Sequence, residues 1–431
     1  MLDATALTVG IVIGAGIFRT PSIVAANASS TWMVYLAWSL GGVISLIGAL
    51  VYAELASTYP HPGGDYYYLK RAFGFRFSFL FAWARMSVIQ TGSIAFLAFA
   101  FGDYAGRLMP LGEYSSSIYA ALVILGLTGL NILGVRHGTL TQNLLTSIQV
   151  CGLVAVIVAG FAVAAPPLAA SPASSTPTSS SLGLMMVFVL LTYGGWNELS
   201  YVSGEMRDPQ HNVVRVLIVS ILIITGIYVL INWAYLHALG LSGTAGTDQV
   251  AAELVRRAFG EREAVLVSIL VGISILTTAN ATVFTGARTS YAFGHDFAPF
   301  AFLGKWNDHT GTPVNALILQ GTVSLVLLLL GTLTRKGFET IVEYTAPVFW
   351  FFFLMTGISL FALRRQEPRI ARPFRVPLYP ITPLLFCFTC ADLLYSSVAY
   401  TGIGALAGVI VLAIGALLAG CYNRPASIAN P

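Results

Sequence analysis

Gly14-Ala15-Gly16-Ile17-Phe18 and Tyr193-Gly194-Gly195-Trp196-Asn197 decide how this sequence folds. The first stretch interrupts the apolar run 5–26, and the second interrupts the apolar run 183–204. Both runs are long enough to cross a bilayer as a helix. Because glycine lets a helix unwind, each stretch exposes backbone N–H and C=O groups that lipid cannot satisfy. We therefore expect two broken membrane helices whose freed backbone needs a polar partner.

The rest of the chain is equally apolar. Of its 431 residues, 56% are hydrophobic and only 9% are charged, far below the roughly 25% charge of soluble domains. The apolar runs are continuous, unlike the alternating ten-residue segments of an outer-membrane barrel. We predict an all-α membrane protein with twelve transmembrane helices in a single domain over 1–431. The predicted spans are 5–26, 33–56, 77–101, 117–135, 141–164, 183–204, 212–239, 264–291, 314–333, 340–363, 378–398 and 402–421.

The two interrupted runs are the first and the sixth, so they lie five spans apart. Discontinuous helices in corresponding positions of two halves indicate a transporter built from inverted repeats, with its substrate near the bilayer midplane. We expect a five-plus-five repeat over 1–165 and 183–363, followed by two further helices over 378–421. Glycines that only allow close helix packing are the alternative for one Gly-x-Gly, but two such breaks favour binding.

The freed backbone predicts the chemistry of the substrate. N–H groups and the positive helix end near Gly14 to Ile17 suit a carboxylate, while freed carbonyls of both breaks suit an ammonium. An α-amino acid carries both groups.

Other classes of function lack support in the sequence. The four cysteines lie inside apolar runs and form no metal-binding set, and the six histidines show no HExxH pattern. A Gly-x-Ser-x-Gly elbow is absent, and Arg19 stands where a dinucleotide-binding motif would need its third glycine. We expect no enzyme activity, no cofactor, no metal and no nucleic-acid partner.

The distribution of Lys and Arg predicts the orientation. The larger share falls in the loops that face the cytoplasm when the N-terminus is inside. We expect both termini to be cytoplasmic. Residues 166–181 form a predicted outer loop, and the amphipathic segment 248–259 is expected to lie along the outer surface as a helix.

Three motifs together resemble a known family. Gly14-Ala15-Gly16-Ile17-Phe18, Tyr52-Ala53-Glu54-Leu55 and Pro60-His61-Pro62-Gly63-Gly64-Asp65-Tyr66 resemble the first spans of amino acid–polyamine–organocation transporters. The run from Tyr193 to Asn197 is similar to the L-type amino-acid transporter branch. The resemblance implies amino-acid transport by alternating access, often as exchange. It also implies that the substrate is bound by Ile13, Gly14, Ala15, Gly16, Ile17, Tyr193, Gly194 and Asn197.

The sequence departs from this family in three places. Leu191 stands where many relatives have Phe as a lid over the substrate, and Gln149 stands where many have Lys. The loop 109–115 lacks the cysteine by which animal members join a glycoprotein, so we expect no disulfide-linked heavy chain. This departure favours a stand-alone carrier in a bacterial-type inner membrane. Gln149, Thr278 and Thr282 are candidate coupling residues. This corner could hold sodium, or only Gln149 and water, and we favour a sodium-independent exchanger.

Charges inside the apolar runs need partners. Glu54 and Glu205 are expected in salt bridges at the cytoplasmic ends of their spans, and Arg85 and Asp392 in buried pairs. Glu198 directly follows the second break, where it could touch substrate, carry a proton or face a solvated vestibule.

Together these observations predict secondary transport of small or neutral L-amino acids, with exchange as the favoured mode. Uptake of cationic amino acids or polyamines, and proton- or sodium-coupled symport, are the alternatives within transport. A channel is disfavoured because no filter-like carbonyl repeat is present.

Overall fold

The computed structural model describes residues 1–14, 16–163, 179–247, 249–334, 337–401 and 403–421. Within these ranges the chain is helical and contains no strand. The elements are α1 (Leu2–Val12), α2 (Gly16–Asn27), α3 (Thr31–Thr58), α4 (Asp65–Phe73), α5 (Phe75–Ala84), the π-helical turn η1 (Arg85–Ile89), α6 (Gln90–Leu108), α7 (Ser115–Leu133), α8 (Val135–Ala162), α9 (Ser179–Thr192), the 3₁₀ helix η2 (Trp196–Glu205), α10 (Pro209–Ala245), α11 (Val250–Phe259), α12 (Glu261–Asp296), the 3₁₀ helix η3 (Ala298–Gly304), α13 (Val314–Thr334), α14 (Gly337–Gln366), α15 (Ile381–Thr401) and α16 (Ile403–Cys421).

The helices fit a protein that crosses a membrane many times. Within the described ranges, nine are long and apolar enough to span a bilayer, and ten if the bent pair α1 and α2 is one span. The runs 183–204 and 402–421 also form helices, but α9 is short and only Gly408–Gly420 of α16 counts as a shorter apolar helix. The all-helical membrane class is confirmed, and the count of twelve stays a prediction.

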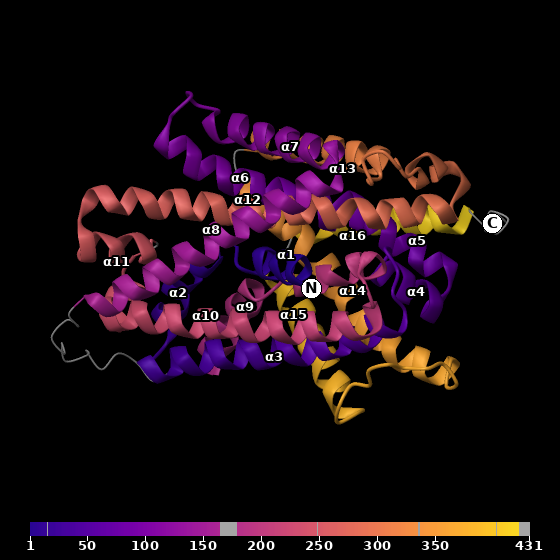
Figure 1. The fold of residues 1–431 in the computed structure, drawn as a ribbon, viewed down its shortest axis with the longest axis horizontal. Helices are drawn as coiled ribbons and strands as arrows, with labels where there is room; N and C mark the ends of the chain where they lie inside the picture. Colours follow the sequence, from indigo (N-terminus) through magenta and orange to yellow (C-terminus); the bar gives the residue numbers. More distant parts are fainter. Residues whose placement is uncertain (15, 164–178, 248, 335–336, 402, 422–431) are drawn as a thin grey trace.

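The long helices lie side by side along the long axis of the molecule (Figure 1). α3 packs against α10, and α12 packs against both α6 and α8. The short helices α4 and α11 lie at opposite ends of the bundle, α4 on the right and α11 on the left in Figure 1. α4 follows α3 and α11 follows α10, the second span of each predicted repeat. An inverted repeat would place corresponding segments at opposite ends, and the repeat itself stays a prediction.

A helix, α11, forms within the predicted segment 248–259, and its place on the outer surface stays a prediction. Five of its apolar side chains, including Leu254, are buried, and Phe259 at its end is exposed. Arg256 and Arg257 in its last turn form ion pairs with Glu253.

Both predicted breaks are present. α1 ends at Val12, α2 begins at Gly16, and the two helices are bent by 45°. The α9 helix ends at Thr192, and η2 begins at Trp196 after Gly195 has turned the chain with a φ of 109°. An L-residue avoids this left-handed region, so the second break requires glycine at this position.

Glu54 and Glu205 are both in salt bridges, as predicted. The Glu54 carboxylate accepts hydrogen bonds from Arg364 at 2.5 Å and from Arg372 at 3.4 Å. The Glu205 carboxylate lies 2.5 Å from the guanidinium of Arg288 on α12. These pairs satisfy charges that would otherwise be costly in an apolar setting.

The expected buried pair at Asp392 is wrong. Its side chain lies on the exposed face of α15, a helix that packs mainly against α14 and α3 and leaves its other side open. Two other predictions fall on residues that the structure does not describe, namely Ala15 in the first break and most of the outer loop 166–181.

Candidate substrate site

The two broken helices meet at their breaks. A Cβ at Gly195 would lie 2.5 Å from Cγ2 of Ile11, so η2 packs directly on the end of α1. A Cβ at Gly16 would lie 3.0 Å from the Thr192 side chain, so α2 packs in the same way on α9. The Thr192 hydroxyl also donates to Oγ1 of Thr20 at 2.8 Å. The halves of the two spans therefore pair with one another on either side of the breaks.

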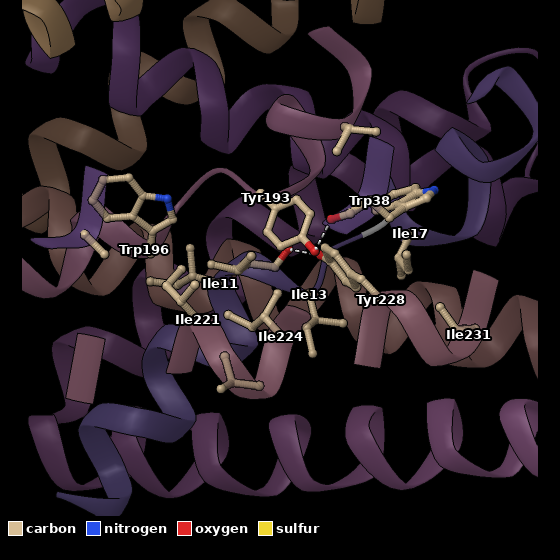
Figure 2. Packing of buried hydrophobic residues seen from close by; sticks show 14 of the residues in the cluster. Ile11, Ile13, Ile17, Trp38, Tyr193, Trp196, Ile221, Ile224, Tyr228 and Ile231 are labelled. Atoms are coloured by element: carbon tan, nitrogen blue, oxygen red, sulfur yellow. Dashed lines mark hydrogen bonds between the residues drawn. The ribbon is translucent and has the colours of Figure 1, made fainter. Parts of the chain in front are cut away.

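One buried hydroxyl joins the backbones of both breaks. Tyr228 of α10 places its hydroxyl 2.9 Å from the Val12 carbonyl and 3.1 Å from the Thr192 carbonyl. A tyrosine has a single O–H, so it donates fully to only one of these carbonyls at a time. Figure 2 shows the Tyr228 ring close to Tyr193 and Trp38, beside the isoleucines of the first break. The Val12 and Thr192 carbonyls therefore share one buried hydrogen-bond donor.

Of the predicted coupling residues Gln149, Thr278 and Thr282, one contacts the first break. The Thr278 hydroxyl of α12 lies 3.1 Å from the Gly10 carbonyl and 3.2 Å from the Ile11 carbonyl and donates its one proton to either of them. The Thr282 hydroxyl instead donates to the Thr278 carbonyl of its own helix at 2.7 Å. Gln149 of α8 is fully buried, and neither polar atom of its amide has a hydrogen-bond partner among the described residues. Thr278 is therefore the coupling candidate that the structure joins to the break.

The first turn of α2 offers donors for a ligand. The first N–H groups of a helix have no partner within it and carry its positive end. At this turn Gly14 and Gly16 are half-buried, while the side chains of Ile13 and Ile17 are fully buried. The chain thus presents backbone, rather than side chains, at the position predicted for a carboxylate.

The second break offers an amide and a small space. Asn197 is buried, with 3% of its surface exposed. A cavity of about 40 Å³ lies against Gly194 and Asn197 and is also lined by Phe353 and Cys390. An amide beside this space can donate to, or accept from, a polar group of a ligand.

Two of the predicted site residues point elsewhere. The Tyr193 ring is fully buried, and its hydroxyl donates to the Trp38 carbonyl at 3.0 Å. Leu191 is 59% exposed, outside the packed core. Tyr193 therefore packs in the core beside the second break and is hydrogen-bonded to α3. Leu191 lies outside the core, so a change of its rotamer needs no change in the packing of the helices.

Glu198 is neither solvated nor free. Its carboxylate lies 2.7 Å from the Arg85 guanidinium and accepts a hydrogen bond from Thr285 at 2.5 Å. The side chain belongs to a residue only 9% exposed, so the solvated alternative is wrong. The same contact identifies the predicted partner of Arg85.

The sequence did not predict Tyr228 or Thr192 as part of the site. Both lie in ordinary apolar runs, and their roles depend on contacts with residues far away in the chain. Tyr228 is 216 residues from Val12, and no local pattern indicates such a pairing.

Comparisons with known proteins agree with this geometry. A model of the family described as amino acid permease matches residues 1–420. The chain is 31% identical to the mouse large neutral amino acids transporter small subunit 2, in a match that covers 96% of this chain and 80% of that protein. It is 29% identical to the mouse b(0,+)-type amino acid transporter 1, covering 89% and 80%. It is also 29% identical to the serine/threonine exchanger SteT of Bacillus subtilis (strain 168), covering 89% and 87%.

The family match spans nearly all of the chain, including both interrupted helices and the residues around them. The chain therefore belongs to the amino acid permease family, as a multi-pass membrane transporter of amino acids and not an enzyme.

Proposed function

We propose that this protein exchanges small or neutral L-amino acids across the inner membrane by alternating access between the two repeats. The observation that carries the proposal is the meeting of two broken helices at one buried hydroxyl, that of Tyr228. The substrate carboxylate binds the first N–H groups of α2, and its ammonium binds freed carbonyls at the breaks. The Asn197 amide supplies a further polar contact.

The space beside the second break supports a small substrate side chain. The cavity against Gly194 and Asn197 has a volume of about 40 Å³ and is walled mostly by aromatic and aliphatic groups. Such walls favour a short side chain without charge. The serine/threonine specificity in the name of the Bacillus relative agrees with this size.

A cationic substrate is less well supported. Its second amine would need a free carboxylate, and Glu198, which lies closest along the chain to the second break, is already bound by Arg85 and Thr285. Displacing the Arg85 guanidinium would leave a buried positive charge without a partner, which is strongly unfavourable.

Sodium coupling is also disfavoured by the contacts at the first break. A sodium site there would use the Gly10 and Ile11 carbonyls, and the Thr278 hydroxyl already lies against both and donates its one proton to either of them. Thr282 is directed to its own helix. No carboxylate from the described residues joins this group of oxygens, so we propose that exchange proceeds without sodium.

We further propose that the chain works without a disulfide-linked heavy chain and with both termini in the cytoplasm. The relative named as a small subunit is part of a larger transporter by its name, but the loop 109–115 of this chain contains no cysteine.

Counterflow in liposomes tests the proposed function. Purified protein is reconstituted with unlabelled amino acid inside, and entry of labelled amino acid is measured from a panel outside. Saturable entry that requires internal substrate is expected for serine, threonine, alanine or another small neutral amino acid. Entry that is unsaturable, or that ignores internal substrate, would contradict exchange and favour a channel.

A further inference from the structure

A second buried polar cluster lies between the candidate substrate site and the end of the bundle where α4 lies. Asp65 begins α4, and its Oδ2 accepts hydrogen bonds from Tyr201 at 2.9 Å and Tyr52 at 3.1 Å. Its other oxygen, Oδ1, is buried and has no hydrogen-bond partner among the described residues. Gly64, with a φ of 47°, permits this approach, because a Cβ there would lie 2.6 Å from the Tyr201 ring. One oxygen of the carboxyl is thus held, and the other is left without a partner.

The cluster also holds an ion pair. The Arg85 guanidinium lies 2.7 Å from the Glu198 carboxylate and 3.7 Å from the centre of the Tyr201 ring. Thr285 donates to the same Glu198 oxygen at 2.5 Å. Arg85 lies in the π-helical turn η1, a type of distortion that is frequent at functional sites. The titratable groups that face Asp65 from the surrounding helices are Tyr52, Tyr68, Arg85, Glu198 and Tyr201.

A count of charges shows that the cluster lacks one positive charge. Two carboxylates, Asp65 and Glu198, share the single guanidinium of Arg85, and arginine stays charged in proteins. With both carboxylates ionised, the cluster has a net charge of −1 in a buried place, where an uncompensated charge is costly. Glu198 is already bound by two donors, whereas Asp65 has a bare oxygen. A single proton on Asp65 Oδ1 makes the cluster neutral.

The surroundings of Asp65 favour that proton. Burial raises its pKa to about 7, against the opposing effects of Arg85 and of the hydrogen bonds from Tyr201 and Tyr52. α4 lies between the spans Thr31–Thr58 and Phe75–Gly106 rather than within one of them.

We propose that Asp65 is a proton-binding site whose occupancy holds the end of the transporter around α4 closed. The inference rests on the proposed alternating access, in which η2, the second half of the sixth span, must move away from its neighbours. η2 supplies both Tyr201 and Glu198, while Arg85 and Thr285 come from η1 and α12. Separation of these elements lets water reach Asp65, which then ionises as an ordinary carboxyl. A protonated Asp65 therefore stabilises the closed arrangement, and its proton leaves when this end opens.

The size of the effect follows from linkage. Asp65 has a pKa of about 7 when this end is closed and is expected to have the ordinary pKa of about 4 when this end is open and water reaches the carboxyl. With these two values, the ratio of closed to open molecules rises about tenfold from pH 8 to pH 6. Exchange that is limited by opening at this end should slow by a similar factor.

The experiment measures initial rates of counterflow at matched internal and external pH from 6 to 8. The wild-type rate is expected to fall several-fold toward pH 6, and Asp65→Asn to abolish this dependence. Glu198→Gln removes one negative charge, so Asp65 ionises more readily and the fall in rate should move to lower pH. Asp65→Glu keeps a carboxyl at the site and should keep a pH dependence.

His295→Gln is the matched control. His295 lines a separate cavity of about 240 Å³ with His61, Lys70 and Asp296, and it does not belong to the cluster around Asp65. His61 does not change charge between pH 6 and 8, because burial lowers its pKa to about 4. The control variant should keep the wild-type profile.

Three results would overturn the inference: a wild-type rate independent of pH, a wild-type profile in Asp65→Asn, or loss of the dependence in His295→Gln. If Asp65→Asn is inactive, the Glu198→Gln profile decides, and an unshifted profile overturns the proposal. Absence of counterflow at every pH would instead contradict the proposed exchange itself.

Discussion

Substitution of Gly195 by Ala tests whether the two breaks are built to meet. The added Cβ would lie 2.5 Å from Cγ2 of Ile11, and the φ of 109° is a left-handed conformation. The backbone conformation costs about 1–2 kcal/mol for an L-residue, and the overlap costs about 1–3 kcal/mol. Together they amount to roughly 2–5 kcal/mol, a large part of the roughly 5–15 kcal/mol that stabilises a folded protein. We expect lower thermal stability in detergent and a loss of counterflow.

Ile11→Ala separates the two contributions. It removes the methyl group that the new Cβ would strike, so the double variant should recover the overlap cost of about 1–3 kcal/mol but not the backbone cost. Gly226→Ala is the matched control, because a Cβ at Gly226 of α10 meets nothing within 4 Å. The control should be neutral or more stable by up to about 1 kcal/mol. A Gly195→Ala variant as stable as this control, or effects of Gly195 and Ile11 that simply add, would refute the reasoning.

Three further predictions concern the substrate and the coupling ion. Gly16→Val and Gly194→Val should each abolish substrate binding in protein that still folds in detergent. The Cβ at position 16 would lie 3.0 Å from the Thr192 side chain, and the Cβ at position 194 would lie 3.1 Å from the Leu191 carbonyl oxygen. Unchanged uptake would mean that these glycines only allow close helix packing. Leu191→Phe should tighten apparent affinity or favour an occluded state, because a ring covers more area than Leu; no change in affinity, turnover or accessibility would place residue 191 outside the lid. Replacing sodium by choline should leave uptake unaffected, and Thr282→Ala should weaken it only mildly, whereas a strong sodium requirement that disappears in this variant would identify a cation site.

Local sequence patterns were sufficient for the helices and the breaks. Hydropathy identifies an apolar helix without knowledge of its neighbours, and a cluster of glycines marks the point where it unwinds, as at Gly14 and Gly194. The same local reasoning predicted that Glu54 would be in a salt bridge. It could not name the partner, because Arg364 lies 310 residues away in the chain.

Contacts that depend on tertiary packing could not be predicted. The hydroxyl of Tyr228 reaches two breaks that are distant in sequence, and nothing in the run 212–239 distinguishes this tyrosine. For Asp392, local sequence reasoning predicted a tertiary contact that the structure does not contain. A charge in an apolar run predicts a buried side chain, but α15 packs on its neighbours with only part of its surface and leaves Asp392 exposed.

Competition in the counterflow assay tests the central claim, that the two broken helices bind both main-chain ends of an amino acid. The competitors are the best transported amino acid, its amide, and the amine that lacks the carboxylate, at matched concentrations and pH. If the N-terminus of α2 binds the carboxylate, the amide and the amine should compete poorly, because each lacks the negative charge that this helix end favours. An amine that competes as well as its parent amino acid would contradict the assignment of Gly14 to Ile17 and, with it, the account of the site.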